Sequence, residues 1–533
     1  MLFVLNITVI ALVLLIAYWW ATQGAFSAII HLLCVIVAGA LALAFWEPLT
    51  MGLLLRGTGF DVYAWGVSLV GIFVVVLVGL RLLTNKLLPA NVDLPRWANL
   101  SLGFPVGAFA GVLSIGMLIL GAGHVQSERQ ILGFAGYARS TRDGQVKELQ
   151  RLWLPCHQIT DVFYSWLSVN ALRSGQPLRQ YSPDLYRQAA GLVRDSFKRG
   201  KGQVALIESA ATIQGTYLSP PNLERCAVRI SFGRAAKDFG KQLTISASQL
   251  RLIGAAAAQA KPYVAHPVRW SQRDSADRVE TFLFDDLSHY ITSVAGQDNA
   301  EIVVEFPLPA GVQPRFIQIK GTRFMIPEIE EMTASGYDEV LGRALESVSV
   351  VPAAETRGVR AITSPDIRVA NDISPVLVST NELPPGIKAN KNNYLVEGDG
   401  FFRGTRKFPS RELRLLGIYE PVGTKIVKVD VSRGSSADIY GSVLRRDGSG
   451  ATPQLVDSRG NPYTAIGLIH ERPDGVRIKL DPRWGIDVAA DLPHLPTTGN
   501  QKLTLLFRIT EGVTIVSFRL GDVVVGTCSV KVG

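Results

Sequence analysis

The first candidates for chemistry in this chain are two polar residues within an apolar stretch near the N-terminus. His31 and Cys34 stand three positions apart, so a helix would place both on one face. That spacing could seat a metal ion or relay a proton, and an ionisable residue in such a stretch is costly enough to suggest a function. No third ligand stands nearby in the apolar segments, so a neutral packed pair is the preferred interpretation.

The remaining polar residues show no catalytic pattern. The other histidines are scattered along the chain, at His124, His157, His266, His289, His470 and His494. The sequence contains no Gly-Asp-Ser-Gly-Gly, Gly-x-Ser-x-Gly or His-Glu-x-x-His motif. The run from Asp457 to Gly460 could be a ligand loop, but its position between two strand-like runs favours a tight turn. We therefore expect a protein that is not an enzyme and that uses no metal or cofactor.

The cysteines leave two interpretations open. Cys156 and Cys226 could form a disulfide that ties together two parts of the chain beyond the apolar stretch. Cys528 could instead be a partner, or all the thiols could be free.

Four apolar segments dominate the first 124 residues, in which only seven formal charges occur. They cover about residues 2–20, 25–46, 64–84 and 98–121, each close to the ~20 residues that a helix needs to cross a bilayer core. Aromatic residues mark their ends, as at the two faces of a membrane: Trp19, Trp20, Trp46, Tyr63, Trp65 and Trp97. The first segment is not a cleaved signal peptide, because it lacks a basic start and a small-x-small cleavage site.

The last apolar segment carries glycines at four-residue spacing. Gly103, Gly107 and Gly111 would lie along one helical face, where a neighbouring backbone can approach closely. We expect this face to pack within the bundle. A seam between copies of the chain would use the same geometry and stays open as the alternative.

The apolar region resembles the colicin V production protein family. The matching residues are Asn6 early in the first segment, Gly24 at the junction before the second, and the glycine-spaced run from Asn99 to Gly111. The family usually has an acid where Asn6 stands. The resemblance covers about residues 1–122 and implies a bundle of four spans.

With Asn6 included, the possible polar site within the membrane comprises Asn6, His31 and Cys34. The chain departs from the family after the junction glycine, where Ser27 and Ala28 replace charged residues. A role for those charges is therefore not expected here. Some relatives carry a trypsin-like protease after the bundle, and its motif is missing from this sequence.

Helical patterns follow the apolar region as far as residue 222. Ser182-Pro183-Asp184 is a good helix start, and Leu185, Ala189, Leu192, Val193 and Phe197 then repeat at helical spacing. A second helix is expected from Thr160. We interpret residues 123–222 as a stalk or collar.

Beyond residue 223, short β-branched runs separated by turn residues predict β-sandwich modules. An internal repeat with an offset of 201 residues supports this interpretation. It relates Val228 and Ile230 to Val429 and Val431, and Phe306 to Phe507. Two copies of a unit of ~100 residues are the size expected for immunoglobulin-like sandwiches.

The sequence thus predicts a multidomain membrane protein in five parts. These are a four-span α-helical transmembrane bundle (1–122), a short helical stalk (123–222), an all-β immunoglobulin-like sandwich (223–326), a connector (327–424) and a second such sandwich (425–533). The connector is expected to open with a helix at Asp338–Ser347 and to continue as an extended segment, Ile362–Asn393, docked on the modules.

These features lead us to expect an anchored, non-enzymatic protein of the bacterial inner membrane with an extracytoplasmic binding region. The expected partners are the lipid bilayer and an envelope protein or wall polymer, with self-association as a further possibility. The net charge of +9 is dispersed without a dense basic run, so nucleic acid is not an expected partner. The alternative is an accessory factor for transport or toxin export in which the bundle is the active part, as the family resemblance implies.

Overall fold

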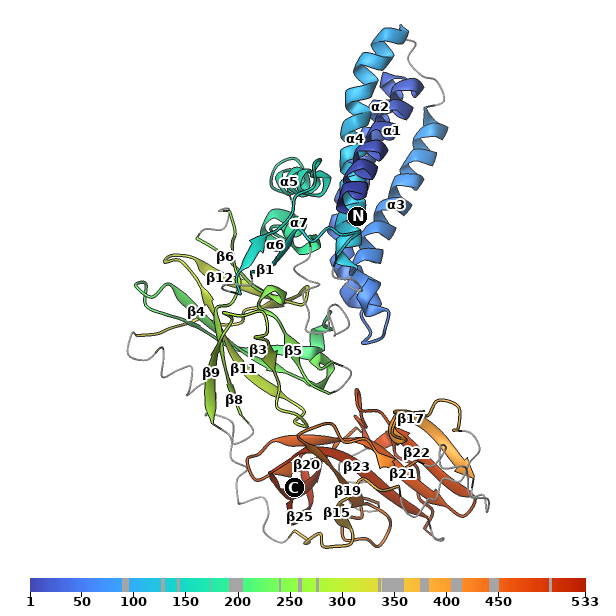
Figure 1. The fold of residues 1–533 in the computed structure, drawn as a ribbon, viewed down its shortest axis with the longest axis vertical. Coiled ribbons are helices and arrows are strands. Elements are labelled where there is room, and N and C mark those ends of the chain that lie inside the picture. Colours follow the sequence, from blue (N-terminus) through green and yellow to red (C-terminus); the bar gives the residue numbers. More distant parts are fainter. Residues whose placement is uncertain are drawn as a thin grey trace.

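The computed structural model describes most of the chain. The described residues are 1–88, 95–125, 130–140, 144–173, 175–190, 205–238, 241–256, 261–274, 278–333, 337, 359–373, 383–403, 415–440, 450–497 and 501–533. They form an elongated molecule with a helical bundle at one end and the C-terminal β-strands at the other (Figure 1).

Four long helices form the bundle. They are α1 (Leu2–Gln23), α2 (Ala25–Leu49), α3 (Asp61–Leu87) and α4 (Arg96–His124), and a π-helical turn, η1 (Thr50–Leu54), extends α2. All four are long and apolar enough to cross a membrane, which confirms the four predicted segments. Gly24 joins α1 to α2 with a φ of 102°, a conformation that favours glycine.

Aromatic side chains gather at both ends of the bundle. At one end the ring of His31 stacks on Trp20, and the Arg81 guanidinium lies 4.5 Å from the Trp20 ring centre. At the other end Trp46 packs edge-on against both Trp65 and His124. The two aromatic groups therefore bracket the apolar length of the helices.

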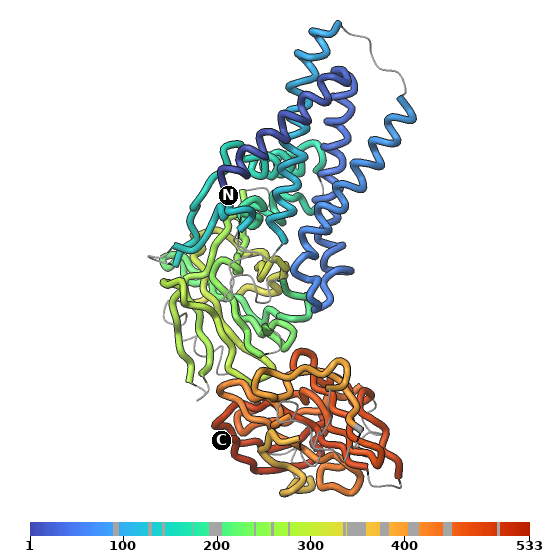
Figure 2. Tube along the Cα trace, turned by 45° about the vertical axis from the view of Figure 1, so that its right-hand side comes forward, coloured from blue at the N-terminus to red at the C-terminus, as the bar shows by residue number. Residues whose placement is uncertain are grey.

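The next segment lies against the side of the bundle. Its elements are β1 (Tyr137–Arg139), β2 (Val146–Glu148), α5 (Cys156–Val169), α6 (Leu178–Tyr181) and α7 (Leu185–Ala189). Figures 1 and 2 show α5 beside the bundle, so the segment is not an extended stalk. The helix expected from Thr160 begins four residues earlier, at Cys156.

The helix expected after Ser182 is present as α7. The later residues of its predicted stripe, Leu192, Val193 and Phe197, lie outside the described residues, as does the helix predicted at Asp338–Ser347.

Module 1 comprises strands β3 to β14. Their bounds are β3 (Ala211–Leu218), β4 (Arg225–Phe232), β5 (Thr244–Ile245), β6 (Leu250–Ala255), β7 (Tyr263–Ala265), β8 (Arg269–Arg273), β9 (Val279–Leu283), β10 (Ile291–Thr292), β11 (Ala300–Pro307), β12 (Gln313–Ile319), β13 (Thr322–Met325) and β14 (Glu330–Glu331). The two larger sheets run β14-β3-β4-β11-β8-β9 and β13-β12-β6-β7. Alternating apolar residues of both, such as Val228, Val304, Leu252 and Ile317, form one buried core.

Module 2 comprises strands β15 to β25. Their bounds are β15 (Ile367–Val369), β16 (Lys388–Ala389), β17 (Tyr394–Arg403), β18 (Gly417–Ile418), β19 (Thr424–Asp430), β20 (Pro453–Asp457), β21 (Pro462–Arg472), β22 (Gly475–Leu480), β23 (Lys502–Thr510), β24 (Thr514–Leu520) and β25 (Val523–Lys531). Short 3-10 turns occur in both modules, at Glu208–Ala210, Arg234–Ala236, Ala247–Gln249 and Ala489–Asp491. The antiparallel pairing in both modules confirms the predicted β-rich region.

The two modules share their central strand register at the offset seen in the sequence. In module 1, Val228 of β4 pairs with Val304 of β11. In module 2, Val429 of β19 pairs with Leu505 of β23, which is the same pair shifted by 201 residues. The main difference lies in β21, whose first half pairs with β20 and whose second half pairs with β23, whereas module 1 uses the separate strands β7 and β8 for these pairings.

The structure moves two of the predicted boundaries. Module 1 begins before residue 223, because β3 (Ala211–Leu218) pairs with β4 along its length. The predicted connector contributes to module 2, since β15 pairs with β19 and β17 pairs with β22. The sequence analysis assigned β3 to the helical segment and β17 to the connector. Strand β15 lies within Ile362–Asn393, the extended segment expected to dock on the modules.

Candidate ligand-binding sites at the junctions

The predicted polar site does not form as one group. Asn6 lies near the start of α1, where its Oδ1 accepts a hydrogen bond of 2.8 Å from the backbone N–H of Trp153. His31 stacks on Trp20 near the other end of α1. Fourteen residues of helix, about 21 Å, separate Asn6 from Trp20. Asn6 is thus a tether for the chain that follows the bundle.

His31 and Cys34 face different neighbours. The Cys34 sulfur lies 4.0 Å from the Thr84 hydroxyl oxygen, while His31 packs on the Trp20 ring. No group of three metal-ligating side chains occurs within the described part of the chain.

The glycine face of α4 lies against α1 of the same chain. A Cβ added to Gly103 would lie 3.0 Å from the Ala21 Cα, and one added to Gly107 would lie 3.0 Å from the Ala17 carbonyl oxygen. At Gly111 the nearest atom would be the Val13 carbonyl oxygen, at 3.2 Å. Because α1 covers this face, the glycines serve packing within the bundle and not a seam between copies.

Of the interpretations left open for the cysteines, the structure has the free thiols, and no disulfide joins Cys156 to Cys226. Cys156 is a free thiol in the apolar cluster around α1 and α4, whereas Cys226 is a free thiol in the core of module 1. Each side chain is fully buried in a different core, which keeps the two sulfurs apart. Burial also raises the pKa of the Cys226 thiol to about 12, so this residue is poorly reactive.

Helix α5 packs on the bundle through contacts with both α2 and α4. The Tyr164 hydroxyl donates a hydrogen bond of 2.9 Å to the Val35 carbonyl oxygen. Gly39 and Gly116 leave room for α5, because a Cβ at either position would lie 2.1 Å or less from the Tyr164 or Thr160 side-chain oxygen. The close approach explains why small residues stand at both positions.

The segment after the bundle also binds module 1. Arg139 donates hydrogen bonds to three backbone carbonyls of one module 1 loop, those of Asp286, Leu287 and His289. The Arg251 guanidinium donates to the Pro183 carbonyl oxygen at 2.8 Å. The bundle and module 1 are therefore connected through a packed segment.

An apolar groove of about 860 Å³ lies where the bundle, α5 and module 1 meet. Apolar side chains of α2 and α5, including Leu41, Leu43 and Leu167, line most of it. This volume is within the range of small-molecule sites in proteins. Its shape and lining suit an apolar ligand.

A charged pair closes one end of this groove. Arg323 of β13 binds Glu47 of α2 through two hydrogen bonds, one of them 3.0 Å from Nε to Oε1. The guanidinium also lies 4.8 Å from the ring centre of Tyr181. A half-buried pair with this geometry satisfies both charges and leaves a carboxylate and a guanidinium beside the groove.

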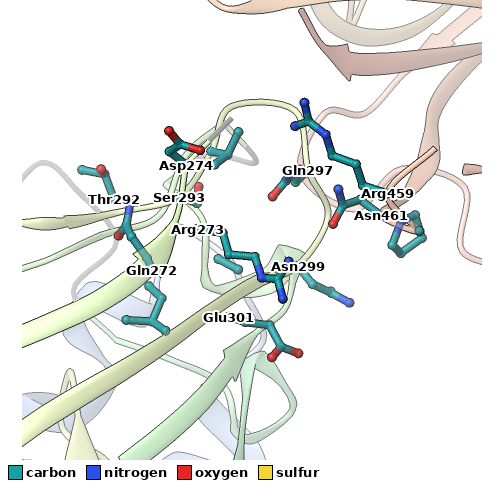
Figure 3. Close-up of a pocket in the computed structure, with 15 residues that line it drawn as sticks. Gln272, Arg273, Asp274, Thr292, Ser293, Gln297, Asn299, Glu301, Arg459 and Asn461 are labelled. Atoms are coloured by element: carbon teal, nitrogen blue, oxygen red, sulfur yellow. The ribbon is translucent and has the colours of Figure 1, made fainter. Parts of the chain in front are cut away.

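A second, polar cleft lies between the two modules (Figure 3). Its volume is about 110 Å³. Module 1 contributes amide and hydroxyl side chains, among them Gln272, Thr292, Gln297 and Asn299, and module 2 contributes the turn that carries Arg459 and Asn461. Side-chain amides and hydroxyls of this kind can hydrogen-bond the many polar groups of a carbohydrate.

The run from Asp457 to Gly460 is both a tight turn and part of the lining of the cleft. Asp457 is buried, and its Oδ1 accepts hydrogen bonds of 2.9 Å from the backbone N–H groups of Arg459 and Asn461. This makes a tight turn, as favoured from the sequence. The same turn presents Arg459 to the cleft.

Three cationic side chains lie at the contact between the modules, and two of them, Lys237 and Arg508, are buried. Arg234, Lys237 and Arg508 surround Asp298, whose Oδ2 accepts a hydrogen bond from the backbone N–H of Thr464. Burial lowers the pKa of the Lys237 ammonium to about 8; Asp298 opposes this shift, whereas Arg234 and Arg508 add to it.

Sequence reasoning missed most of the residues at these junctions. The sequence around Tyr164, Arg323 and Gln297 contains no motif that would mark them as functional. Glu47 could have been found, since it is an isolated acid next to Trp46 at the end of an apolar segment.

Comparison with known proteins finds no matching family model, no matching curated protein and no matching solved structure. The candidate sites are therefore interpreted from their own geometry.

Proposed function

We propose that this chain is a non-enzymatic protein of the bacterial inner membrane that holds two β modules outside the cytoplasm, where they bind a cell-wall polymer. In this proposal α1 to α4 cross the bilayer as a bundle of the colicin V production type. The modules are immunoglobulin-like sandwiches that supply the binding surface.

The arrangement of charges supports this orientation. Arg81, Lys86 and Arg96 flank the connection between α3 and α4, at the end of the bundle that is far from the modules (Figure 1). Exposed Arg56, between η1 and α3, lies at the opposite end, and an excess of basic residues favours the cytoplasmic side. Arg139 follows the bundle at the module end, but it is buried against carbonyls of module 1 and so does not act as a free flanking charge.

The observation that carries the proposal is the polar cleft between the modules. Both copies of the repeat contribute residues to it, so a site forms only where the copies meet. Its amides and hydroxyls are accompanied by two basic and two acidic residues, which are Arg273, Arg459, Asp274 and Glu301. This combination suits a polymer that carries both neutral polar and ionised groups, as peptidoglycan does. Exposed Asn299 and half-buried Gln297 are available to such a ligand.

Co-sedimentation with purified peptidoglycan tests this function. The full chain in lipid nanodiscs is expected to sediment with the insoluble polymer. Replacing Gln297 and Asn299 together with alanine removes two side-chain amides from the cleft and should weaken binding about tenfold, or about 1.4 kcal/mol.

Asn392→Ala provides the matched control, because it removes an exposed amide of module 2 that lies outside the cleft. This variant should bind as the unmodified chain does. The proposal fails if the unmodified chain stays in the supernatant or if the cleft variant binds at full strength.

A further inference from the structure

The apolar groove can be placed relative to the length of the bundle. Ser27 accepts a hydrogen bond of 2.9 Å from Arg81 at one end of α2, and Glu47 lies at the other end. The 20 residues between them span about 30 Å, which is the thickness of a bilayer's hydrocarbon core. The groove starts at Ala40, about 10 Å inside the Glu47 end.

Helix α5 forms one wall of the groove at this depth. Its Tyr164 is bonded to Val35, which lies about 18 Å from Glu47 along α2 and so near the middle of the apolar length. The side chains of His157 and Asp161 in this helix are buried, while Val162 and Trp166 face outward and are more than half exposed. A 14-residue helix with such an outer face suits a re-entrant segment in contact with lipid.

The outer rim of the groove is apolar on both sides. Leu41 lies on the α2 side and Leu172 follows α5, and both are exposed. Phe45, one turn from Leu41 on α2, is 57% exposed. The groove is thus continuous with the surface that the bundle would present to lipid.

The polar end of the groove lies where a lipid headgroup would be. The Glu47–Arg323 pair stands at the end of the apolar length, and the side chains of Ser168, Gln176 and Ser182 line the same groove. A ligand that is apolar at the depth of Ala40 and polar at the depth of Glu47 is an amphiphile.

We propose that this groove binds one acyl chain of a membrane phospholipid, whose headgroup lies beside Glu47 and Arg323. The proposal rests on the membrane location proposed above, but not on polymer binding. The bound lipid fills the space between α2 and α5 and so joins the bundle to module 1.

Lipid retention by the purified full chain tests this site. Native mass spectrometry after detergent exchange is expected to show about one retained phospholipid per chain, restored by adding back phosphatidylethanolamine. Ala44→Trp places an indole in the groove from an exposed position of α2 and should reduce retention at least tenfold.

Leu33→Trp is the matched control, since Leu33 is an exposed residue of α2 that does not line the groove. It should retain lipid as the unmodified chain does. The proposal is overturned if the unmodified chain retains no phospholipid or if Ala44→Trp retains as much as Leu33→Trp. Carbonate extraction of membranes and peptidoglycan co-sedimentation of the same variants separate loss of this site from failure of the anchoring or polymer-binding proposals.

Discussion

Lys237, at the contact between the modules, has a lowered pKa because of its surroundings. Its side chain is almost fully buried, and two of its close neighbours, Arg234 and Arg508, are also cations. Burial and these neighbours favour the neutral amine, so the folded state binds a proton at this site less tightly than the unfolded chain does. The contact is therefore sensitive to pH.

The sign of this dependence follows from the two pKa values. The pKa of Lys237 is about 8 in the folded chain, below its ordinary value of 10.5. Between these values the unfolded chain binds more protons, so stability should rise with pH by up to about 3 kcal/mol. Lys237→Met should remove this rise and increase the unfolding temperature at pH 7, as measured by thermal unfolding in detergent.

The control for this prediction is Lys261→Met, which changes an exposed lysine of the same module. It should keep the pH dependence of the unmodified chain. An unchanged pH profile in Lys237→Met would show that another group is responsible.

Single residues were predicted unevenly from the sequence. The spacing of Gly103, Gly107 and Gly111 identified a packing face, because helical periodicity is a local property. The same reasoning paired His31 with Cys34, although the His31 ring stacks on Trp20 from a different helix. The spacing of residues within one helix does not show which residues of other helices will contact them.

At the scale of the element, α5 depends on space left by glycine. A Cβ at Gly116 would lie 2.0 Å from the Thr160 hydroxyl oxygen and 2.5 Å from the Cys156 carbonyl oxygen. Gly116→Ala should therefore displace α5 and destabilise the chain by about 1–3 kcal/mol. Thermal unfolding and limited proteolysis around residues 150–175 would report the change.

Gly79→Ala offers a matched substitution in α3, where nothing lies within 4 Å of the added Cβ. It should be neutral or slightly stabilising, since alanine favours helix more than glycine does. Equal effects of the two substitutions would contradict the docking of α5.

Strands were predictable where the repeat supplied a second copy. The offset of 201 residues located β4, β11 and their counterparts, because each pattern could be checked against the other. Strand β3 pairs with β4, yet its sequence was assigned to the helical segment. Strand β3 lies between β14 and β4 and acquires its structure from these neighbours, so the sequence alone does not reveal it.

For the whole molecule, the order of bundle, intermediate segment and β modules could be read from the sequence. Their contacts could not, because they join residues far apart in the chain. Arg323 binds Glu47, and Arg234 donates a hydrogen bond to the Trp484 carbonyl oxygen at 3.2 Å. The first contact lies at the groove and the second joins the two modules, between which the cleft lies, so both candidate sites depend on tertiary structure.

The central claim is that the bundle spans a membrane with the modules on the extracytoplasmic side. Introduced cysteines can test it with a membrane-impermeant maleimide on intact spheroplasts. The native Cys34, Cys156 and Cys226 are buried, and the unmodified chain controls for the half-buried Cys528. Asn392 in module 2 and Lys86 near the far end of α3 are exposed positions for substitution.

We expect Asn392→Cys to be labelled in intact spheroplasts and Lys86→Cys to be labelled only after the membrane is permeabilised. The opposite pattern would place the modules in the cytoplasm and contradict the account, and labelling of both positions in intact cells would show that the bundle does not cross the membrane.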